Sequence, residues 1–340
     1  MPSRRIAWLT AAAALLASCG GGGGGGGGSG PAAAPAVITV GNAPVIAGEV
    51  VRVALATSDF ADSTVGTSTV SASSTPAAMA LTRAGNATVQ QAARTVAGPG
   101  TAALAIGPET VPCDVSGSVT LSGNIQNETI LTAGDQITAD FFACDDGDGT
   151  VLDGLLDLTV LSAAGDFLGM GSFSGSFSLT FTELRLTEGT EVNTANGDVT
   201  LETEFDTATD IDTSTLSGSE LELTSGPDTW RLNDFAVTTT VGPFQILPDP
   251  PIDVTRIAAT GTLLGSGFEG TVDFTTVRPF EHLENSDHPG AGELLITGAN
   301  DATIRIIDAA GANVTLEVDL NGDAVPDTIL DSTWNALLDD

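Results

Sequence analysis

The sequence predicts a mainly β protein, in which an antiparallel meander forms a sandwich or a curved half-barrel and is preceded by a small alanine-rich helical segment. The first observation is a period of two after Cys113. In "FSLTF", residues 177–181, large apolar residues alternate with serine and threonine, as in a strand with one buried face. The second observation is that turn clusters, and no helical crossovers, separate such segments. Neighbouring strands are therefore expected to pair antiparallel.

Ten or more segments share this pattern, which is enough for a meander that buries one side. They are "SVTLSG", "QITADFF", "LLDLTVL", "FSLTF", "VTLETEF", "ELELT", "FAVTTTV", "GTVDFTT", "ELLIT", "TIRII" and "VTLEV". The turn clusters include "TANGD", "TSGPD" and "TGAND". The prolines of "VGPFQILPDPPIDV", residues 241–254, interrupt strand pairing and predict a long loop within one domain, with a boundary between two sheets as the alternative.

The region before these segments is rich in alanine and lacks the alternation. "NAPVIAGEVVRVALATSD" predicts a helix that begins at Asn42 as its cap and places Ile46, Val50 and Val53 on one face. A second, weaker helix is predicted near "ATVQQAARTV", and residues 97–112 are interpreted as a connector. Residues 37–110 are therefore expected to form a helical or irregular segment that packs on the β domain of residues 111–340.

The N-terminus combines two arginines, an apolar run over residues 6–16 and small residues before Cys19. This order is typical of a secretory signal. Leu16-Ala17-Ser18-Cys19 resembles the lipobox of bacterial lipoproteins, in which signal peptidase II cuts before the cysteine and its thiol is diacylated. The resemblance implies that residues 1–18 are a signal peptide and that Cys19 is the lipid attachment point. Glycine at the next position implies the outer membrane of a Gram-negative bacterium, on either of its faces.

Nine glycines, residues 20–28, follow the cysteine. Glycine has no side chain to pack and loses much conformational entropy when it is ordered. Residues 19–36, which end in "PAAAP", are therefore expected to remain unfolded and to act as a lipidated tether between the membrane and the domain.

Charge excludes several classes of partner. Cleavage before Cys19 removes two of the ten basic residues, so eight arginines remain against 44 acidic residues and the formal charge falls from −34 to −36. Nucleic acid requires cations to meet its phosphates, so it is not expected as a partner. The same charge opposes attachment to anionic lipid, and contact with the membrane is expected through the anchor alone.

Two cysteines remain after Cys19. In an exported protein, Cys113 and Cys144 are expected to form a disulfide, with two free thiols as the alternative. Closing a loop of about 30 residues would stabilise the fold by roughly 3 to 4 kcal/mol in the chain-entropy model.

The sharpest candidate for a ligand site is "DLNGDAVPD", residues 319–327. It resembles the calcium loops of the FG-GAP (integrin-type) and EF-hand-like families, and the resemblance implies five oxygen donors. These are Asp319, Asn321, Asp323, the carbonyl of Val325 and Asp327. Ala324 departs from the glycine that those loops use for a left-handed turn. The alternative is a polar turn stopped by Pro326.

Other clusters give weaker signals. "CDDGDGTVLD", residues 144–153, is interpreted as an acidic turn beside the disulfide rather than a calcium site. His282 and His288 lie in a segment typical of a solvated loop rather than a zinc site. "GSFSG", residues 171–175, imitates a nucleophile elbow but has phenylalanine at its centre, and nothing assembles a catalytic triad.

These features together resemble lipoproteins of proteobacteria that have no assigned function. The leading hypothesis is a lipid-anchored envelope protein whose acidic, non-catalytic β domain is a structural or binding module. The alternative is a carrier, in which a half-barrel holds an acyl chain or another apolar ligand against the faces of Phe177, Leu179, Phe181 and Phe205. A hydrolase is the third hypothesis, without a recognisable set of catalytic residues.

Overall fold

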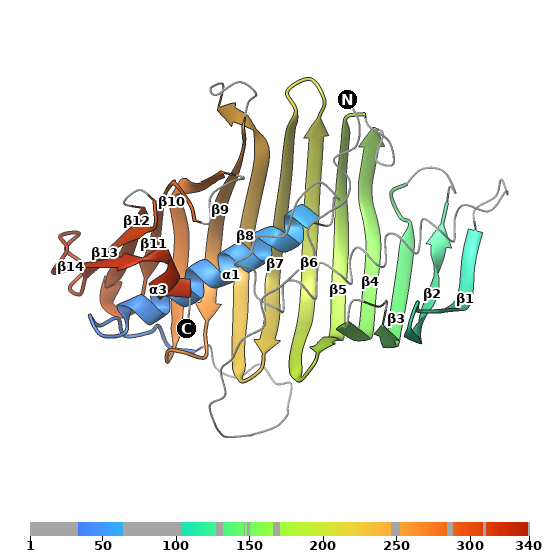
Figure 1. Cartoon of the computed structure of the whole chain (residues 1–340), viewed down its shortest axis with the longest axis horizontal. Coiled ribbons are helices and arrows are strands. Elements are labelled where there is room, and N and C mark those ends of the chain that lie inside the picture. Colours follow the sequence, from blue (N-terminus) through green and yellow to red (C-terminus); the bar gives the residue numbers. More distant parts are fainter. Residues whose placement is uncertain are drawn as a thin grey trace. The chain divides into compact units, whose positions relative to one another are not determined.

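Fourteen strands, counted over the residues that the structure describes, form one antiparallel sheet (Figure 1). The computed structural model describes residues 33–63, 104–126, 132–145, 147, 150–165, 171–245, 252–283, 288–308 and 311–338. The strands are β1 (Leu104–Pro112), β2 (Ser116–Ile125), β3 (Gln136–Asp145), β4 (Thr150–Gly165), β5 (Phe173–Glu188), β6 (Glu191–Asp206), β7 (Ile211–Ser225), β8 (Asp228–Gln245), β9 (Ile252–Leu264), β10 (Thr271–Leu283), β11 (Ala291–Thr297), β12 (Thr303–Asp308), β13 (Asn313–Asp319) and β14 (Thr328–Thr333). The helices are α1 (Ala43–Ser63), the 3-10 turn η1 (Ala299–Asp301) and α3 (Trp334–Leu338).

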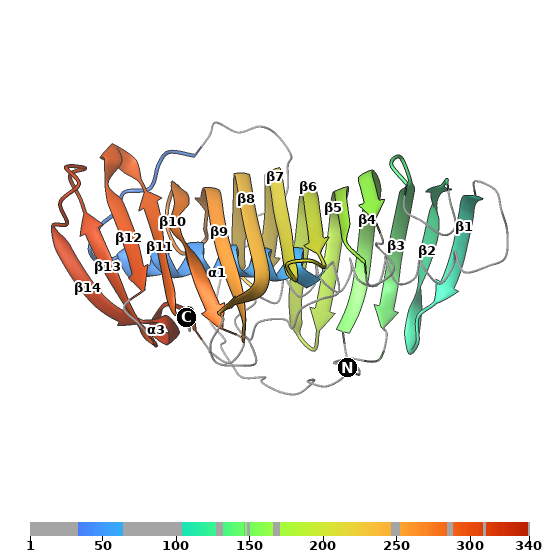
Figure 2. The same ribbon diagram turned by 90° about the horizontal axis from the view of Figure 1, so that it is seen from above.

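The strand order confirms the predicted antiparallel meander. Each strand pairs with its neighbours in sequence, and the row runs from β1 to β14 without a crossover (Figure 2). The first and last strands of the row do not pair with each other, so the sheet is open. Because all the described strands share this one sheet, the sandwich alternative is excluded. An open sheet with a helix across one face agrees with the half-barrel alternative.

Alternation along the strands divides the sheet into an apolar face and a polar face. On β5, Phe177, Leu179 and Phe181 are at most 5 % exposed, while Ser178 and Thr180 between them are more exposed on the other side. We call the face that carries the buried side chains the inner face and the opposite one the outer face. Phe205 is only half-buried, so the four side chains proposed to line a carrier cavity are not equally enclosed.

Helix α1 confirms the predicted N-terminal helix and packs on β7, β8, β9, β12, β13 and α3 (Figure 1). Ile46 and Val50 lie one turn apart and are completely buried. Gly48 lies so close to the carbonyl of Leu337 in α3 that a Cβ atom there would overlap it. The first helix of the described chain is thus held against its last.

The start of α1 corrects the predicted cap. The backbone N–H of Asn42 donates to the hydroxyl of Thr39 (3.2 Å), and the backbone N–H of Thr39 donates to the side-chain oxygen of Asn42 (2.7 Å). This reciprocal pair has the geometry of a capping box in which Thr39 is the cap. Asn42 is the third residue after this cap, and its side chain points back to Thr39 rather than forward along the helix.

Two segment boundaries also differ from the prediction. The tether was expected to remain unfolded to residue 36, but Pro35 forms a bridge with Thr271 and Ala36 is buried. The connector predicted over residues 97–112 is wrong from Leu104 onward, because β1 pairs with β2 there. As an edge strand, β1 tolerates Pro108 and Pro112, since one side of its backbone needs no partner.

Glycines within the long strands mark β-bulges that alternation alone does not predict. Gly197 has φ 137° and lies in the middle of β6, where "TANGD" was expected to form a turn. Across from it, Glu183 of β5 has φ 48° and donates its N–H to the side-chain oxygen of Asn196 (2.6 Å). Ala143 of β3 (φ 44°) donates in the same way to Asp153 (2.8 Å), beside Gly154. The Asn-Gly pair therefore lies opposite a bulge in β5, and the turn of this hairpin lies at residues 189–190.

Candidate functional site

The Asp-rich loop, Asp319–Asp327, connects β13 to β14 and is organised around Asp319. The carboxylate of Asp319 accepts the N–H groups of Asn321 (3.0 Å), Gly322 (2.9 Å) and Ala324 (2.7 Å). Asp327 closes the loop by accepting the N–H of Leu320 (2.8 Å). Each of these carboxylates accepts backbone N–H groups that would otherwise have no acceptor within the turn.

Asp319 is only 4 % exposed. Its burial raises the pKa of the carboxyl, but the backbone N–H groups that bind the charged form outweigh burial, so the pKa lies below the ordinary 3.8. Ala324 adopts φ 65°, the left-handed conformation that the resemblance to calcium loops implies for this position. The loop thus has the expected turn, with alanine where glycine would be less strained.

The side-chain oxygens that were predicted to bind calcium accept hydrogen bonds from the backbone of the loop itself. Asn321 and Asp323 accept the N–H groups two residues further on, at 2.9 Å each. Over the residues that the structure describes, no three His, Cys, Asp or Glu side chains lie close enough to share a metal ion. Asp319, Asp323 and Asp327 are therefore not brought together, and calcium binding by this loop stays a prediction.

The predicted disulfide is present. Cys113 and Cys144 are bonded, with their Cα atoms 5.5 Å apart and a sequence separation of 31. The bond connects the turn after β1 to the end of β3, and the N–H of Val115 donates to the carbonyl of Asp145 beside it (2.9 Å). Asp153, from the acidic cluster that follows, binds the bulge at Ala143. Asp146 and Asp148 lie outside the described residues.

Several sequence candidates fall elsewhere. Cys19 and the predicted second helix lie outside the described residues. His282 lies near the end of β10, and His288 precedes β11. The acidic residues between them lie outside the described part of the chain. Trp334 is fully buried in α3 with its ring against Phe280, 5.7 Å between centroids, and is a packing residue.

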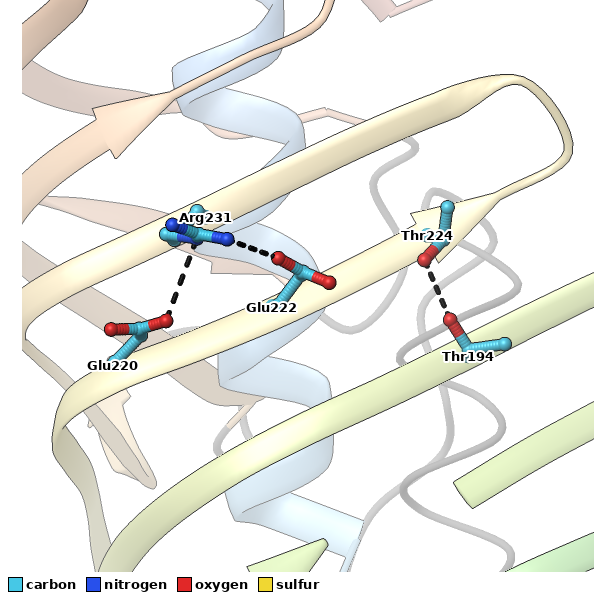
Figure 3. A network of polar contacts seen from close by, with 5 residues as sticks. All are labelled: Thr194, Glu220, Glu222, Thr224 and Arg231. Carbon is cyan, nitrogen blue, oxygen red and sulfur yellow. Dashed lines mark hydrogen bonds and ion pairs between the residues drawn. The ribbon is translucent and has the colours of Figure 1, made fainter. Parts of the chain in front are cut away.

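The outer face is polar, and on it Arg231 pairs with acidic side chains of the neighbouring strand (Figure 3). Arg231 of β8 donates to Glu222 of β7 (2.6 Å) and lies 3.5 Å from Glu220. The hydrogen bond to Glu222 raises the pKa of Arg231 further above its usual range. Next to this pair, the hydroxyls of Thr194 and Thr224 are 2.6 Å apart. Because Arg231 is 43 % exposed, the ion pairs contribute little stability and mainly set the charge pattern.

A groove of about 620 Å³ crosses the outer face at the bulges of β3 to β6. Apart from Gly154 and Leu155, its side chains are carboxylates, hydroxyls, an amide and one guanidinium, so the lining offers both donors and acceptors. The lining residues are Asp140, Asp153, Gly154, Leu155, Thr182, Glu183, Arg185, Thr194 and Asn196. The alternating pattern could not reveal this groove, because bulges bring together residues that simple register keeps apart.

The inner face carries polar side chains that the sequence analysis missed. Thr203, Ser214 and Thr239 form one cross-strand row on β6 to β8, and each is at most 4 % exposed. Thr239 lies 2.6 Å from the hydroxyl of Ser58 in α1. Asn193 of β6 is 0 % exposed, and its amide nitrogen and oxygen both lack a hydrogen-bond partner. The interruption of apolar alternation at Asn193 is the signal that could have identified it.

No protein-family model matches the chain, and no curated protein or solved structure is significantly similar to it. Neither α1 nor α3, the α-helices of the described residues, has the length and apolar composition that crossing a membrane requires.

Proposed function

We propose that the chain is an exported protein anchored by lipid at Cys19 to the outer membrane, and that its acidic β domain is a non-catalytic binding module. The groove at the bulges of β3 to β6 carries this proposal, because it combines a volume of about 620 Å³ with polar groups of both signs. Ligand sites commonly have volumes of about 300 to 1,000 Å³. The lipobox resemblance and the glycine tether support the anchoring part.

Metabolic labelling with an alkyne fatty acid tests the anchor. The wild-type chain is expected to take up label and to fractionate with the outer membrane, while Cys19→Ala is expected to do neither. Cys113→Ala is the matched control, because it removes a cysteine from the domain and should leave labelling intact. Equal labelling of wild type and Cys19→Ala would exclude attachment at Cys19.

Native mass spectrometry of the mature chain, purified from the envelope, tests the module. A co-purifying component should be retained by wild type and by Glu269→Gln, which changes an exposed carboxylate outside the groove. Glu183→Gln, which changes a carboxylate in the groove lining, should retain less of it. Equal retention by the two variants would place binding outside the groove.

The carrier of an apolar ligand is the second candidate function, and one observation favours it. The inner face of β5 and β6 is lined by large apolar side chains, yet it contains the unpartnered amide of Asn193. Because Phe177, Leu179 and Phe181 are at most 5 % exposed and Asn193 is 0 % exposed, an amphiphile would reach this face only by displacing the part of the chain that buries it. Lipid in the mass spectrum of the purified chain would support the carrier, and its consistent absence would count against it.

A further inference from the structure

The open sheet ends in two edge strands, and these differ in how well they are protected. β1 contains Pro108 and Pro112 and has a register shift after Ile106, and both features hinder pairing with a further strand. β14, at the other end of the row, has neither a proline nor a register shift (Figure 1). Within the described residues, β14 pairs with β13 alone. Its second side therefore offers unpaired backbone groups to another strand.

The strand register identifies the backbone groups on the free side of β14. The N–H of Trp334 donates to the carbonyl of Ala312, and this pair continues the register of β13 and β14. Hydrogen-bonded and non-hydrogen-bonded pairs alternate along an antiparallel ladder, so every second residue before Trp334 bonds to β13 in the same way. The N–H and carbonyl groups of the residues between them, Ile329, Asp331 and Thr333, therefore point away from β13.

Ile329 provides an exposed apolar side chain at this edge. It is 60 % exposed, and it lies on the outer face together with Asp331 because both alternate with the partly buried Leu330. Edge strands usually prevent pairing with another chain by means of lysine, proline or a bulge, and β14 contains none of these. A strand added beside β14 would cover Ile329 and extend the ladder.

Charge indicates what kind of strand fits this edge. Among the described residues, Asp331 forms no ion pair and accepts one long hydrogen bond, from the hydroxyl of Thr315 (3.5 Å). Arg305 on the same face donates to Glu293 (2.6 Å) and lies 3.7 Å from Glu317. This cluster therefore has three carboxylates and one guanidinium, and a lysine or arginine opposite Asp331 would complement it. A second copy of this acidic chain would instead add another Asp331, which disfavours it as the occupant.

We propose that the free edge of β14 binds an extended segment of a partner protein, with a lysine or arginine opposite Asp331 and an apolar residue opposite Ile329. The segment joins the sheet as an added strand, whose backbone exchanges hydrogen bonds with Ile329, Asp331 and Thr333. Its cation binds the carboxylate of Asp331. This edge lies at the end of the row, away from the groove of β3 to β6, so it binds a protein independently of any ligand in the groove.

The test measures binding of a fluorescent peptide, Lys-Thr-Lys-Val-Val-Thr, to the mature chain by fluorescence anisotropy. In an antiparallel pairing, its second lysine lies opposite Asp331 and its second valine opposite Ile329. Wild type should bind this lysine peptide about tenfold more tightly than the glutamate peptide Glu-Thr-Glu-Val-Val-Thr. Ile329→Pro should weaken binding by about tenfold or more, because proline removes an N–H that faces the partner but none that bonds to β13. Glu183→Gln, in the groove, should bind the lysine peptide like wild type.

Variants of Asp331 separate recognition at the edge from general attraction to an acidic protein. Asp331→Asn should weaken binding of the lysine peptide about two- to fivefold. Asp273→Asn is the matched control, because Asp273 is also exposed and accepts a threonine hydroxyl but lies on the interior strand β10, and it should bind like wild type. Asp331→Lys should reverse the preference in favour of the glutamate peptide, and this result does not depend on whether Ile329→Pro folds.

Sedimentation of the wild-type chain tests the second copy as the occupant of this edge. A monomer is expected, whereas a dimer that Ile329→Pro dissociates would assign the edge to a second copy and overturn the proposal. No binding of the lysine peptide by wild type would also overturn it. So would a preference for the lysine peptide that Asp331→Lys leaves unchanged, because the attraction would then come from the net charge of the chain.

Discussion

The long strands β4 to β9 and the short strands β11 to β14 hold together in different ways. The long strands have 13 to 18 residues, and most of their pairings contain a register shift. The short strands have six or seven residues and pair without any shift. A β-bulge bends its strand and increases the local twist, so the long ladders change direction at their bulges, whereas the short ladders run without interruption. The stability of the long strands therefore depends on backbone conformation at their bulges, and the stability of the short strands depends on the packing of their side chains.

Trp334 should show the largest effect, because it supports the short strands from α3. Trp334→Ala removes a fully buried ring that contacts Phe280 and should lower the free energy of unfolding by about 3 to 5 kcal/mol. Urea denaturation measures the change. Trp334→Phe keeps most of the volume and should cost much less; equal losses from the two variants would mean that packing of the ring is not what supports this region.

The disulfide gives a third region, β1 to β3, a covalent support. Replacing Cys113 and Cys144 together by alanine should cost roughly 3 to 4 kcal/mol, because the open chain regains the entropy of a loop with a separation of 31 residues. Thermal unfolding of the double variant, compared with the reduced wild type, measures this. The two should unfold alike, and a large difference between them would point to packing of the sulfur atoms.

Gly154 tests the bulges of the long strands. It has φ 105°, and a Cβ atom there would overlap the carbonyl of Glu183, so Gly154→Ala should cost about 2 to 3 kcal/mol. Gly189 is the matched control, since it has φ 59° in a turn with open space around it, and its alanine variant should cost only about 1 kcal/mol. Equal costs for both substitutions would contradict the role of the bulge.

Ala324 tests the turn of the short strands in the stabilising direction. Ala324→Gly should raise the free energy of unfolding by about 1 kcal/mol, because glycine adopts φ 65° without strain. The same change at Ala336 in α3 should have the opposite sign, since glycine is a poor helix former. A destabilised Ala324→Gly variant would show that the entropy of the unfolded chain dominates.

Asp206 tests a turn of the long strands and should show the smallest effect. Hydrogen bonds from the N–H of Ala208 and the hydroxyl of Thr209 lower the pKa of Asp206 below 3.8. A lowered pKa stabilises the fold above the unfolded value, and this contribution is lost as pH falls through the folded value. Asp206→Ala should therefore be slightly less stable than wild type at neutral pH. The difference should vanish well below pH 3.8, and one that persisted in acid would exclude a contribution from the charge.

The sequence predicted the fold class because alternation is a direct consequence of burying one face. Strands with strict alternation were identified, but β1, β9 and β14 were not among the predicted segments. In β9, the small residues Ala258 and Ala259 are adjacent and weaken the alternating pattern. In β14, the apolar residues Ile329 and Leu330 are adjacent and lie between polar residues, so no alternation is visible. Both segments form strands because they pair with neighbouring strands that alternate more strictly, and a local sequence pattern cannot show such pairing.

The Asn-Gly pair at residues 196–197 shows why local signals gave a wrong turn. Asn196 and Gly197 favour positive φ, which serves a hairpin turn and a bulge equally well. The choice depends on whether another strand offers an N–H, and here Glu183 does. For the sites, the disulfide followed from compartment and cysteine count. Whether the carboxylates of Asp319, Asp323 and Asp327 come together depends on the geometry of the loop, which their spacing in the sequence does not determine.

The contact between α1 and α3 has a consequence for how the chain acquires its structure. Every described strand pairs with its neighbour in sequence, so each hairpin can form as soon as it has been synthesised. Helix α1, however, also contacts α3, where Arg52 donates to the carbonyl of Leu338, 286 residues further on, and Gly48 lies against Leu337. A chain that lacks α3 can therefore pack α1 on β7 to β9 but leaves the surface around Gly48 uncovered.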